Sequence, residues 1–276
     1  MLESGPADSG VRVKIAANIS FLFTELAPLA RIAAARQAGF DGVELLFPYD
    51  LDPDAVGREV RAQGMTLVQI NSPPGKREAG EVGFAAVPGR EQDFEISVQT
   101  AFAWLEAAGG SQLHVLAGVP APGTDRGLVH GTYVRNLQWL GDVAAAKGMR
   151  IMIEPLNTRD VPGYALTTLA QAADVLRNVA RPNVGLQLDL YHSQIMGGDL
   201  TFRIRQFAPL IRHVQIAGAP DRNEPDRGEV DLAHVLRTLA EVGYDGWISG
   251  EYRPTAGTPD SLQWLQLAAP FRSSRP

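Results

Sequence analysis

The stretch AKGMRIMIE, residues 146–154, contains the kind of junction that decides the fold. Its glycine, Gly148, stands between an Ala-rich segment and a short apolar run. Because glycine readily takes the left-handed conformation that ends helices, this pattern predicts a helix that leads directly into a strand. The stretch AQGMTLVQI, residues 62–70, repeats the pattern, and AAGGSQLHV, residues 107–115, is a looser copy.

A second form of the junction adds an aromatic residue and an aspartate after the glycine. It occurs in AGFDGVE, residues 38–44, and in VGYDGWI, residues 242–248. Junctions of such closely related design indicate a chain that is built from repeated strand–helix units.

Eight short apolar runs complete these units, at residues 12–17, 42–47, 66–70, 112–117, 150–154, 183–188, 212–216 and 247–251. Helical patterns lie at residues 26–38, 53–63, 92–108, 130–147, 168–179, 200–208, 230–242 and 259–268. Nearly continuous apolar runs are typical of parallel strands that are buried on both faces. We therefore predict a single (β/α)8 TIM barrel. The alternative, a doubly wound open sheet, is less favoured because no G-x-G-x-x-G motif follows a run.

The composition predicts one catalytic domain over residues 12–270, with disordered tails at residues 1–11 and 271–276. The chain has no cysteine, which excludes disulfides and thiolate metal sites and fits a cytoplasmic protein. A net charge of -6 without a Lys/Arg run argues against a nucleic-acid partner. Neither a signal peptide nor a membrane span is expected, because no apolar stretch is long enough. Whether the chain forms a homo-oligomer stays open.

Four polar residues end or interrupt the last four apolar runs, and they form the candidate metal site: Glu154, Asp189, Gln215 and Glu251. In a barrel of this kind the carboxyl ends of the strands meet at one face, which holds the active site. Three carboxylates and one amide at a single point would repel one another unless a cation joined them. Oxygen ligands without thiolates favour Mg²⁺ or Mn²⁺, and Zn²⁺ or Co²⁺ stay open.

The same four residues suggest a reaction. A metal ion between Glu154 and Glu251 suits the transfer of a proton between adjacent carbons of an α-hydroxycarbonyl substrate. One glutamate would remove the proton and the other would deliver it, while the cation would stabilise the enediolate. For a single strand-end acid the ordinary alternative, a helix cap or an ion pair, is the stronger explanation. For four acids and amides on consecutive strands it is the weaker one.

Five further residues are candidate substrate contacts: Glu44, Asn71, His192, Arg222 and Arg253. Glu44 and Asn71 fall at strand ends, and His192 is expected in the loop after the sixth strand. The two arginines follow the seventh and eighth strands and could clamp a carboxylate bidentately. Each of these residues could equally serve an ordinary structural role. The long connection at residues 72–91 is predicted to be either a lid over the barrel mouth or a plain insertion.

Seven stretches carry a resemblance to a known family: ANISFLFTE from Ala17, GFDGVELLFPYD from Gly39, VPGRE from Val87, IEPLN from Ile153, QLDLYH from Gln187, HVQIAGAPDRNEPDRGEV from His213 and GWISGEY from Gly246. Together they resemble the hydroxypyruvate isomerase family, and within it the 2-oxo-tetronate isomerase branch. The resemblance implies a TIM barrel of the xylose isomerase-like superfamily. It also implies acid and base roles for Glu154 and Glu251, and metal ligation by the four residues named above.

The chain departs from hydroxypyruvate isomerases proper at three positions, where Ile70, Thr158 and Ala165 replace histidines of that pattern. These differences favour a four-carbon oxo-acid as the substrate. A ketose 3-epimerase acting on a free sugar is the alternative, since it would use the same metal and glutamates. A DNA-repair endonuclease would need a His-rich zinc cluster, for which five histidines are too few. A barrel that only binds a small molecule is the remaining reading.

Overall fold

The computed structural model describes residues 12–272 and shows eight parallel strands that close into a barrel, in the order of the sequence. The strands are β1 (Lys14–Asn18), β2 (Gly42–Leu45), β3 (Thr66–Asn71), β4 (Gln112–His114), β5 (Arg150–Ile153), β6 (Val184–Asp189), β7 (Ile211–Ile216) and β8 (Trp247–Gly250). Each overlaps one of the predicted runs, and β1 pairs with β8 to close the ring. The predicted fold class is therefore confirmed. Of the predicted tails at residues 1–11 and 271–276, only Phe271 and Arg272 lie within the described residues, where Phe271 ends a 3₁₀ turn and Arg272 pairs with Val13 in an isolated β-bridge.

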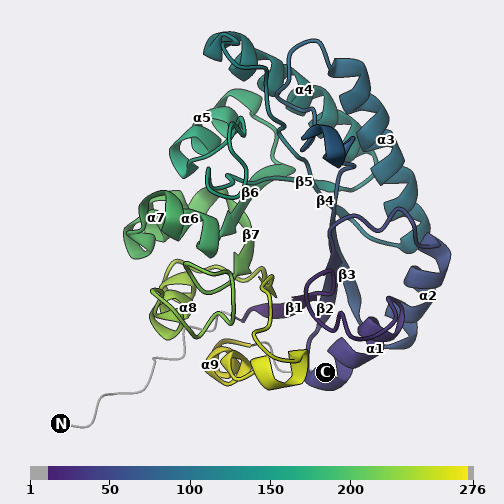
Figure 1. Ribbon diagram of the computed structural model, residues 1–276, viewed down its shortest axis with the longest axis vertical. Coiled ribbons are helices and arrows are strands. Elements are labelled where there is room, and N and C mark those ends of the chain that lie inside the picture. Colours follow the sequence, from purple (N-terminus) through teal and green to yellow (C-terminus); the bar gives the residue numbers. More distant parts are fainter. Residues whose placement is uncertain (1–11, 273–276) are drawn as a thin grey trace.

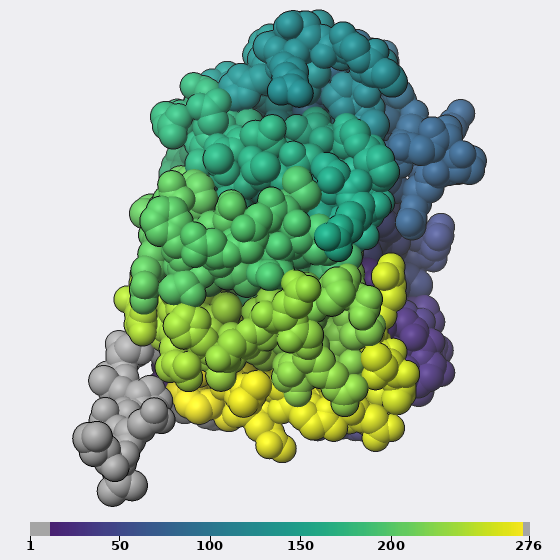
Figure 2. All heavy atoms as spheres, turned by 60° about the vertical axis from the view of Figure 1, so that its left-hand side comes forward, coloured from purple at the N-terminus to yellow at the C-terminus, as the bar shows by residue number. Residues whose placement is uncertain are grey.

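Helices surround the strands (Figure 1). They are α1 (Ala30–Ala38), α2 (Pro53–Ala62), α3 (Glu91–Ala108), α4 (Arg126–Ala146), α5 (Leu169–Val179), α6 (Leu190–Gly197), α7 (Leu200–Phe207), α8 (Leu232–Glu241) and α9 (Trp264–Ala268). Short 3₁₀ turns lie at Arg77–Ala79, Ala208–Leu210, Thr258–Ser261 and Ala269–Phe271. In the side view of Figure 2, consecutive parts of the chain lie in successive bands, as expected when each unit packs on the next. Within residues 12–272, no helix is both long and apolar enough to span a membrane.

The glycine junctions behave as the sequence predicts. At the end of α1, Gly39 has a φ of 102°, and its N–H bonds to the last carbonyls of the helix. At the end of α4, Gly148 has a φ of 67°. Residues with a side chain rarely adopt this conformation, so glycine lets each helix stop and the next strand begin at once.

One helix was not predicted. The sequence analysis expected a loop after the sixth strand, but α6 begins there directly. The reason is Asp189, the last residue of β6, which also caps α6. Its Oδ1 accepts hydrogen bonds from the backbone N–H groups of Tyr191 and His192, at 2.7 and 3.2 Å. A strand-end aspartate that caps a helix removes the need for a connecting loop.

The strands differ from the expected continuous apolar runs because polar residues alternate with apolar ones. In β6, Leu186 and Leu188 belong to the apolar core, whereas Gln187 and Asp189 between and beyond them are buried polar residues. Successive side chains of a strand point to opposite faces, so the apolar set packs on the helices and the polar set fills the barrel. The interior of this barrel is therefore largely a hydrogen-bonded network.

The connection at residues 72–91 pairs with the end of the fourth strand. Ala86 N donates to Ala117 O at 2.7 Å, and Asn136 Nδ2 on α4 donates to Ala85 O at 2.9 Å. Arg90 contacts Glu81 at 2.9 Å and stacks on the ring of Phe84. These bonds hold the second half of the connection against the barrel. A lid function stays a prediction.

Candidate active site

The structure brings the four predicted metal ligands together at the carboxyl end of the barrel. Glu154 follows β5, Asp189 ends β6, Gln215 lies near the end of β7 and Glu251 follows β8. Their exposed fractions are only 4, 2, 1 and 5 %. Two amides connect three of them, Glu154, Gln215 and Glu251. Gln187 Nε2 donates to Glu154 Oε2 at 2.9 Å and to Gln215 Oε1 at 2.7 Å, and Gln215 Nε2 donates to Glu251 Oε2 at 2.5 Å.

Burial disfavours the ionised form of the carboxyl groups in this site. It raises the pKa of Glu154 well above the ordinary value, and the charges of Asp189 and Glu251 raise it further. Burial likewise raises the pKa of Glu251 to about 8, although Arg222 opposes the shift. The pKa of Asp189 is also raised, first by burial. A divalent cation would offset the repulsion that these groups share.

The donor set fits a metal ion. One carboxylate oxygen of Glu154 and one of Asp189 lie within 4.8 Å of each other, and a ring nitrogen of the neighbouring His192 lies within the same distance of both. Glu154 Oε1 is buried and has no hydrogen-bond partner among residues 12–272. A buried oxygen without a partner is costly, and coordination by a cation would satisfy it. The site can therefore hold a metal ion.

His192 is better suited to donate a proton than to bind that metal. The backbone N–H of Asn157 donates to His192 Nδ1 at 3.1 Å, so Nδ1 carries no proton. Burial and then the charge of Arg222 lower the pKa of His192 well below its ordinary value, which keeps the ring neutral. A neutral ring that accepts at Nδ1 carries its proton on Nε2. That Nε2 lies 4.0 Å from Glu154 Oε1 and 3.8 Å from Asp189 Oδ2.

Of the two candidate arginines, only Arg222 reaches the carboxylates. Its Nη2 lies 2.5 Å from Glu251 Oε1 and 3.5 Å from Asp189 Oδ2. The rings of Phe21 and Tyr191 flank its guanidinium, at 5.2 and 5.1 Å. Arg253 is exposed and stacks on Phe21 at 5.6 Å. Arg222 is thus a buried cation beside the site, and Arg253 lies at its rim.

Glu44 and Asn71 take different places. Glu44 Oε1 lies 2.5 Å from His213 Nε2, and its Oε2 accepts from Gln215 Nε2 at 3.0 Å. It is 1 % exposed and supports Gln215 from within the barrel. Asn71 ends β3, where its backbone oxygen accepts a hydrogen bond from Tyr49. A substrate contact by either residue stays a prediction.

Three residues that lie beside the proposed ligands are not among the predicted site residues. Asn18, at the end of β1, donates from Nδ2 to Glu251 Oε2 at 2.9 Å, and Gln187 bridges two of the ligands. His114 is buried with Nδ1 3.4 Å from Glu154 Oε2, and burial lowers its pKa to about 3, so it is neutral. Asn18 ends an apolar run and Gln187 stands two residues before Asp189, so strand periodicity could have found both.

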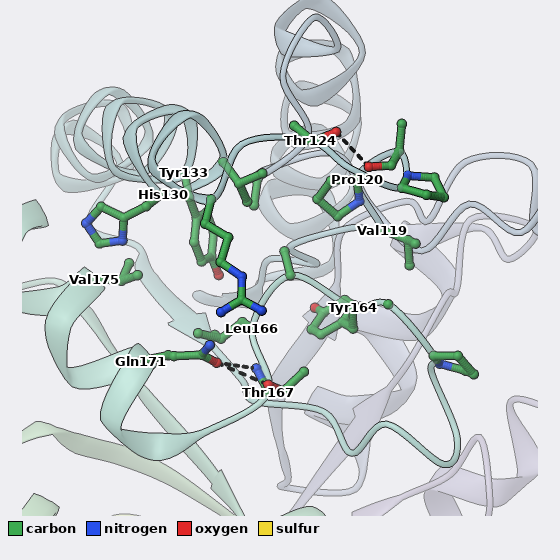
Figure 3. A pocket seen from close by; sticks show the side chains of 18 of the residues that line it. Val119, Pro120, Thr124, His130, Tyr133, Tyr164, Leu166, Thr167, Gln171 and Val175 are labelled. Atoms are coloured by element: carbon green, nitrogen blue, oxygen red, sulfur yellow. Dashed lines mark hydrogen bonds between the residues drawn. The ribbon is translucent and has the colours of Figure 1, made fainter.

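A large pocket lies elsewhere among the described residues. It has a volume of about 1030 Å³ and lies between α4, α5 and the loops that follow β4 and β5. Figure 3 shows Tyr133 of α4 and Leu166 of the β5–α5 loop facing it, with Val119 and Pro120 at its edge. Its walls are mostly apolar, and in the described part of the chain none of the four ligands lines it. Glu154 and Glu251, the carboxyl groups whose pKa values burial raises, lie at the carboxyl end of the barrel instead.

Comparison with known proteins agrees with this fold. Residues 32–268 match the family described as xylose isomerase-like TIM barrel. The chain is 41 % identical over 253 residues to the 2-oxo-tetronate isomerase of Cupriavidus necator, covering 92 % of this chain and 97 % of that protein. It is 35 % identical over 260 residues to the hydroxypyruvate isomerase of Escherichia coli, covering 94 % of this chain and 100 % of that protein.

One solved structure is similar over nearly the whole chain. The protein named as a family 2 AP endonuclease from Brucella melitensis is 43 % identical, with a TM-score of 0.89, and covers 95 % of this chain and 100 % of that one. The 3-keto-D-glucoside 4-epimerase of Escherichia coli has a TM-score of 0.77 at 22 % identity, with 92 % of this chain and 99 % of that one covered. At that identity the likeness shows the fold alone.

Proposed function

Since this chain belongs to the xylose isomerase-like TIM barrel family, we propose that it is a metal-assisted isomerase of a small hydroxy-oxo acid. The reaction would shift a carbonyl group between adjacent carbons of the substrate. The names of the related 2-oxo-tetronate and hydroxypyruvate isomerases support this class of substrate. The loss of three histidines that hydroxypyruvate isomerases carry favours the four-carbon acid.

The observation that carries the proposal is the pair Glu154 and Glu251, two buried carboxyl groups that follow β5 and β8 at the same end of the barrel. Burial raises the pKa of both, and that of Glu251 to about 8, so Glu251 can hold or release a proton near neutral pH. A general acid or base works best when its pKa lies near the working pH. One of the two would take the proton from the substrate carbon and the other would return a proton to the neighbouring carbon.

The ligands of the metal would be Glu154, Asp189, Gln215 and Glu251. Their oxygen donors favour Mg²⁺ or Mn²⁺, with Zn²⁺ or Co²⁺ as further candidates. When bound, the ion would polarise the hydroxyl and carbonyl oxygens of the substrate and stabilise the enediolate. The burial of all four side chains keeps bulk water away from the reacting carbons.

Two neighbouring residues fit the substrate. His192 Nε2, which carries the ring proton, would donate a hydrogen bond to a substrate oxygen. Arg222 is a guanidinium between two aromatic rings, and it would exchange its contact with Glu251 for the substrate carboxylate. This buried cation favours an acid over a neutral ketose. A cytoplasmic location and a homo-oligomeric state stay predictions from the sequence.

The test is solvent exchange by the metal-loaded enzyme in D₂O. We expect deuterium at the carbon next to the carbonyl of hydroxypyruvate or a 2-oxo-tetronate, together with the isomeric product, and we expect EDTA to abolish both. Exchange with free ketoses but not with oxo-acids would decide for a 3-epimerase. An enzyme that binds metal but exchanges no proton in any substrate of three to six carbons would contradict the proposal.

A further inference from the structure

Four buried glutamines form a continuous hydrogen-bonded chain through the barrel. Gln112 Nε2 on β4 donates to Gln69 Oε1 on β3 at 2.9 Å, and Gln69 Nε2 donates to Gln187 Oε1 on β6 at 2.7 Å. Gln187 Nε2 then donates to Gln215 Oε1 on β7 at 2.7 Å. The four side chains are between 1 and 6 % exposed. This series of hydrogen-bonded glutamines crosses the barrel and ends on Gln215, a proposed metal ligand.

The series of hydrogen-bonded glutamines branches at Gln187. Its single amide nitrogen donates one hydrogen bond to Glu154 Oε2, at 2.9 Å, and one to Gln215 Oε1, at 2.7 Å. Its oxygen accepts from Gln69. Both protons and the oxygen are therefore used, and one nitrogen contacts two of the four proposed ligands.

The direction of each amide follows from its partners. As a metal ligand Glu154 must be ionised, so its oxygens only accept, and the nitrogen of Gln187 must face it. The second proton of that nitrogen also needs an acceptor, and the oxygen of Gln215 is that acceptor. If Gln215 were turned over, its nitrogen would face the nitrogen of Gln187. Its oxygen would then face the carboxylates of Glu44 and Glu251, which now accept from its nitrogen at 3.0 and 2.5 Å.

We propose that Gln187 is a positioning residue that turns the amide oxygen of Gln215 toward the metal and holds Glu154 in place beside it. The proposal rests on the metal site of the proposed function and extends it to a residue that touches neither metal nor substrate. A metal binds an amide through its oxygen, so the sense of the Gln215 amide decides whether β7 supplies a ligand. Partners that orient metal ligands typically contribute 10- to 100-fold to metal affinity.

The test compares two substitutions within the same glutamine chain. Gln187→Met has a similar volume and removes both donors. Gln112→Met, at the far end, also removes a buried amide but leaves both bonds of the Gln187 nitrogen intact. The dissociation constant for Mn²⁺ is measured by calorimetry on each folded, metal-free protein, alongside its free energy of unfolding in urea and its kcat and KM.

A positioning role predicts that Gln187→Met weakens Mn²⁺ binding about 10- to 100-fold, whereas Gln112→Met changes it by less than about threefold at a similar loss of stability. We also expect kcat to fall when Mn²⁺ is saturating, because Glu154 loses the hydrogen bond from Gln187. If Gln187→Met does not fold, Gln187→Glu keeps the shape and is expected to weaken binding at least as much.

Three results would overturn the proposal. Gln187 variants that bind Mn²⁺ within threefold of the wild type would remove the role of Gln187 and leave the metal site standing. Equal losses in Gln187→Met and Gln112→Met would mean that affinity only follows stability. A wild-type protein that binds no divalent ion would remove the proposed metal site itself, and with it the role of Gln187.

Discussion

The two halves of the barrel contribute different chemistry to the same interior. Strands β5 to β8 end in the proposed metal ligands, three of which are carboxylates. Strands β1 to β4 contribute supporting groups. Asn18 and Glu44 bond to Glu251 and Gln215, and Gln69 bonds to Gln187 across the barrel. The reacting groups come from the second half, and the first half helps to fix their orientation.

This difference separates two kinds of effect that a substitution can have. A change at a proposed ligand of the second half removes a group that touches substrate or metal, so it should reduce catalysis with little loss of stability. A change in the first half removes a supporting hydrogen bond, so it should reduce stability first and catalysis second. Each of the following predictions tests whether the halves can be separated in this way.

The largest effect is expected from Glu154→Gln and Glu251→Gln. Each removes a proposed acid or base, and general acid–base groups typically contribute about 10²–10⁴-fold in rate. Because both substitutions also remove a buried carboxyl whose pKa burial raises, the metal-free protein should be at least as stable as the wild type at pH 8. Steady-state kinetics and urea unfolding measure the two quantities. A variant that keeps full activity, or that does not fold, would show that catalysis and stability cannot be separated in this way.

Most of the fold was predictable because it depends on local patterns. The glycines that end α1 and α4 show positive φ angles, as the junctions in the sequence predict. The proposed ligands were found because each ends or interrupts an apolar run, and parallel strands bring such ends together. Helix α6 was missed because the ligand interpretation of Asp189 was preferred to a helix cap, although the same carboxylate caps the helix through its Oδ1.

The support from the first half could not be predicted in the same way. That Gln69 bonds to Gln187 depends on the register and closure of the barrel, since the two residues lie 118 positions apart in the chain. Whether Arg222 points inward depends on the rings of Phe21 and Tyr191, which come from two other parts of the chain. Periodicity indicates which side chains face inward, but not which of them meet.

The second prediction concerns substrate recognition. Arg222→Met should raise KM for an oxo-acid about 10- to 100-fold, because a hydrogen bond to a charged group contributes about 1.5–3 kcal/mol. Arg253→Met is the matched control, since Arg253 stacks on the same Phe21 but is exposed at the rim. We expect less than a threefold change there. The contrast should vanish for a neutral ketose, and equal effects of the two substitutions would contradict a substrate contact by Arg222.

The third prediction concerns the supporting half. Glu44→Leu removes one of the two carboxylates that accept a hydrogen bond from Gln215 Nε2, the one at 3.0 Å, and so leaves one proton of this buried amide without a partner. A buried polar group left without a partner costs about 1–3 kcal/mol, so the free energy of unfolding should fall by that amount. The control is Glu241→Leu, which removes an exposed pair with Arg205 and should cost less than about 1 kcal/mol. Equal losses in urea unfolding would show that Glu44 is not a support.

The smallest effect is a pH dependence of stability in the metal-free protein. Burial raises the pKa of Glu251 in the folded state to about 8, from an ordinary value of 4.5, and it raises the pKa of Glu154 as well. The folded state therefore holds protons that the unfolded state has released. Stability must fall as pH rises toward 8, by at most about 1.4 kcal/mol per pH unit for each group.

The buried histidines act in the opposite direction, but only at lower pH. Burial lowers the pKa of His114 to about 3, and that of His192 lies well below the ordinary 6.5. The unfolded state therefore binds their protons below pH 6.5, and stability gains from them as pH rises to that value. Between pH 6.5 and 8 the carboxyl groups of the second half act alone among these residues.

Urea unfolding in EDTA across this window should show falling stability, and Glu251→Gln should make the slope shallower. Because a metal binds the ionised carboxylates, the stability gained from added Mn²⁺ should instead increase with pH over the same window. If the stability of the metal-free protein stays constant or rises with pH in this window, burial does not raise the pKa values of these carboxyl groups.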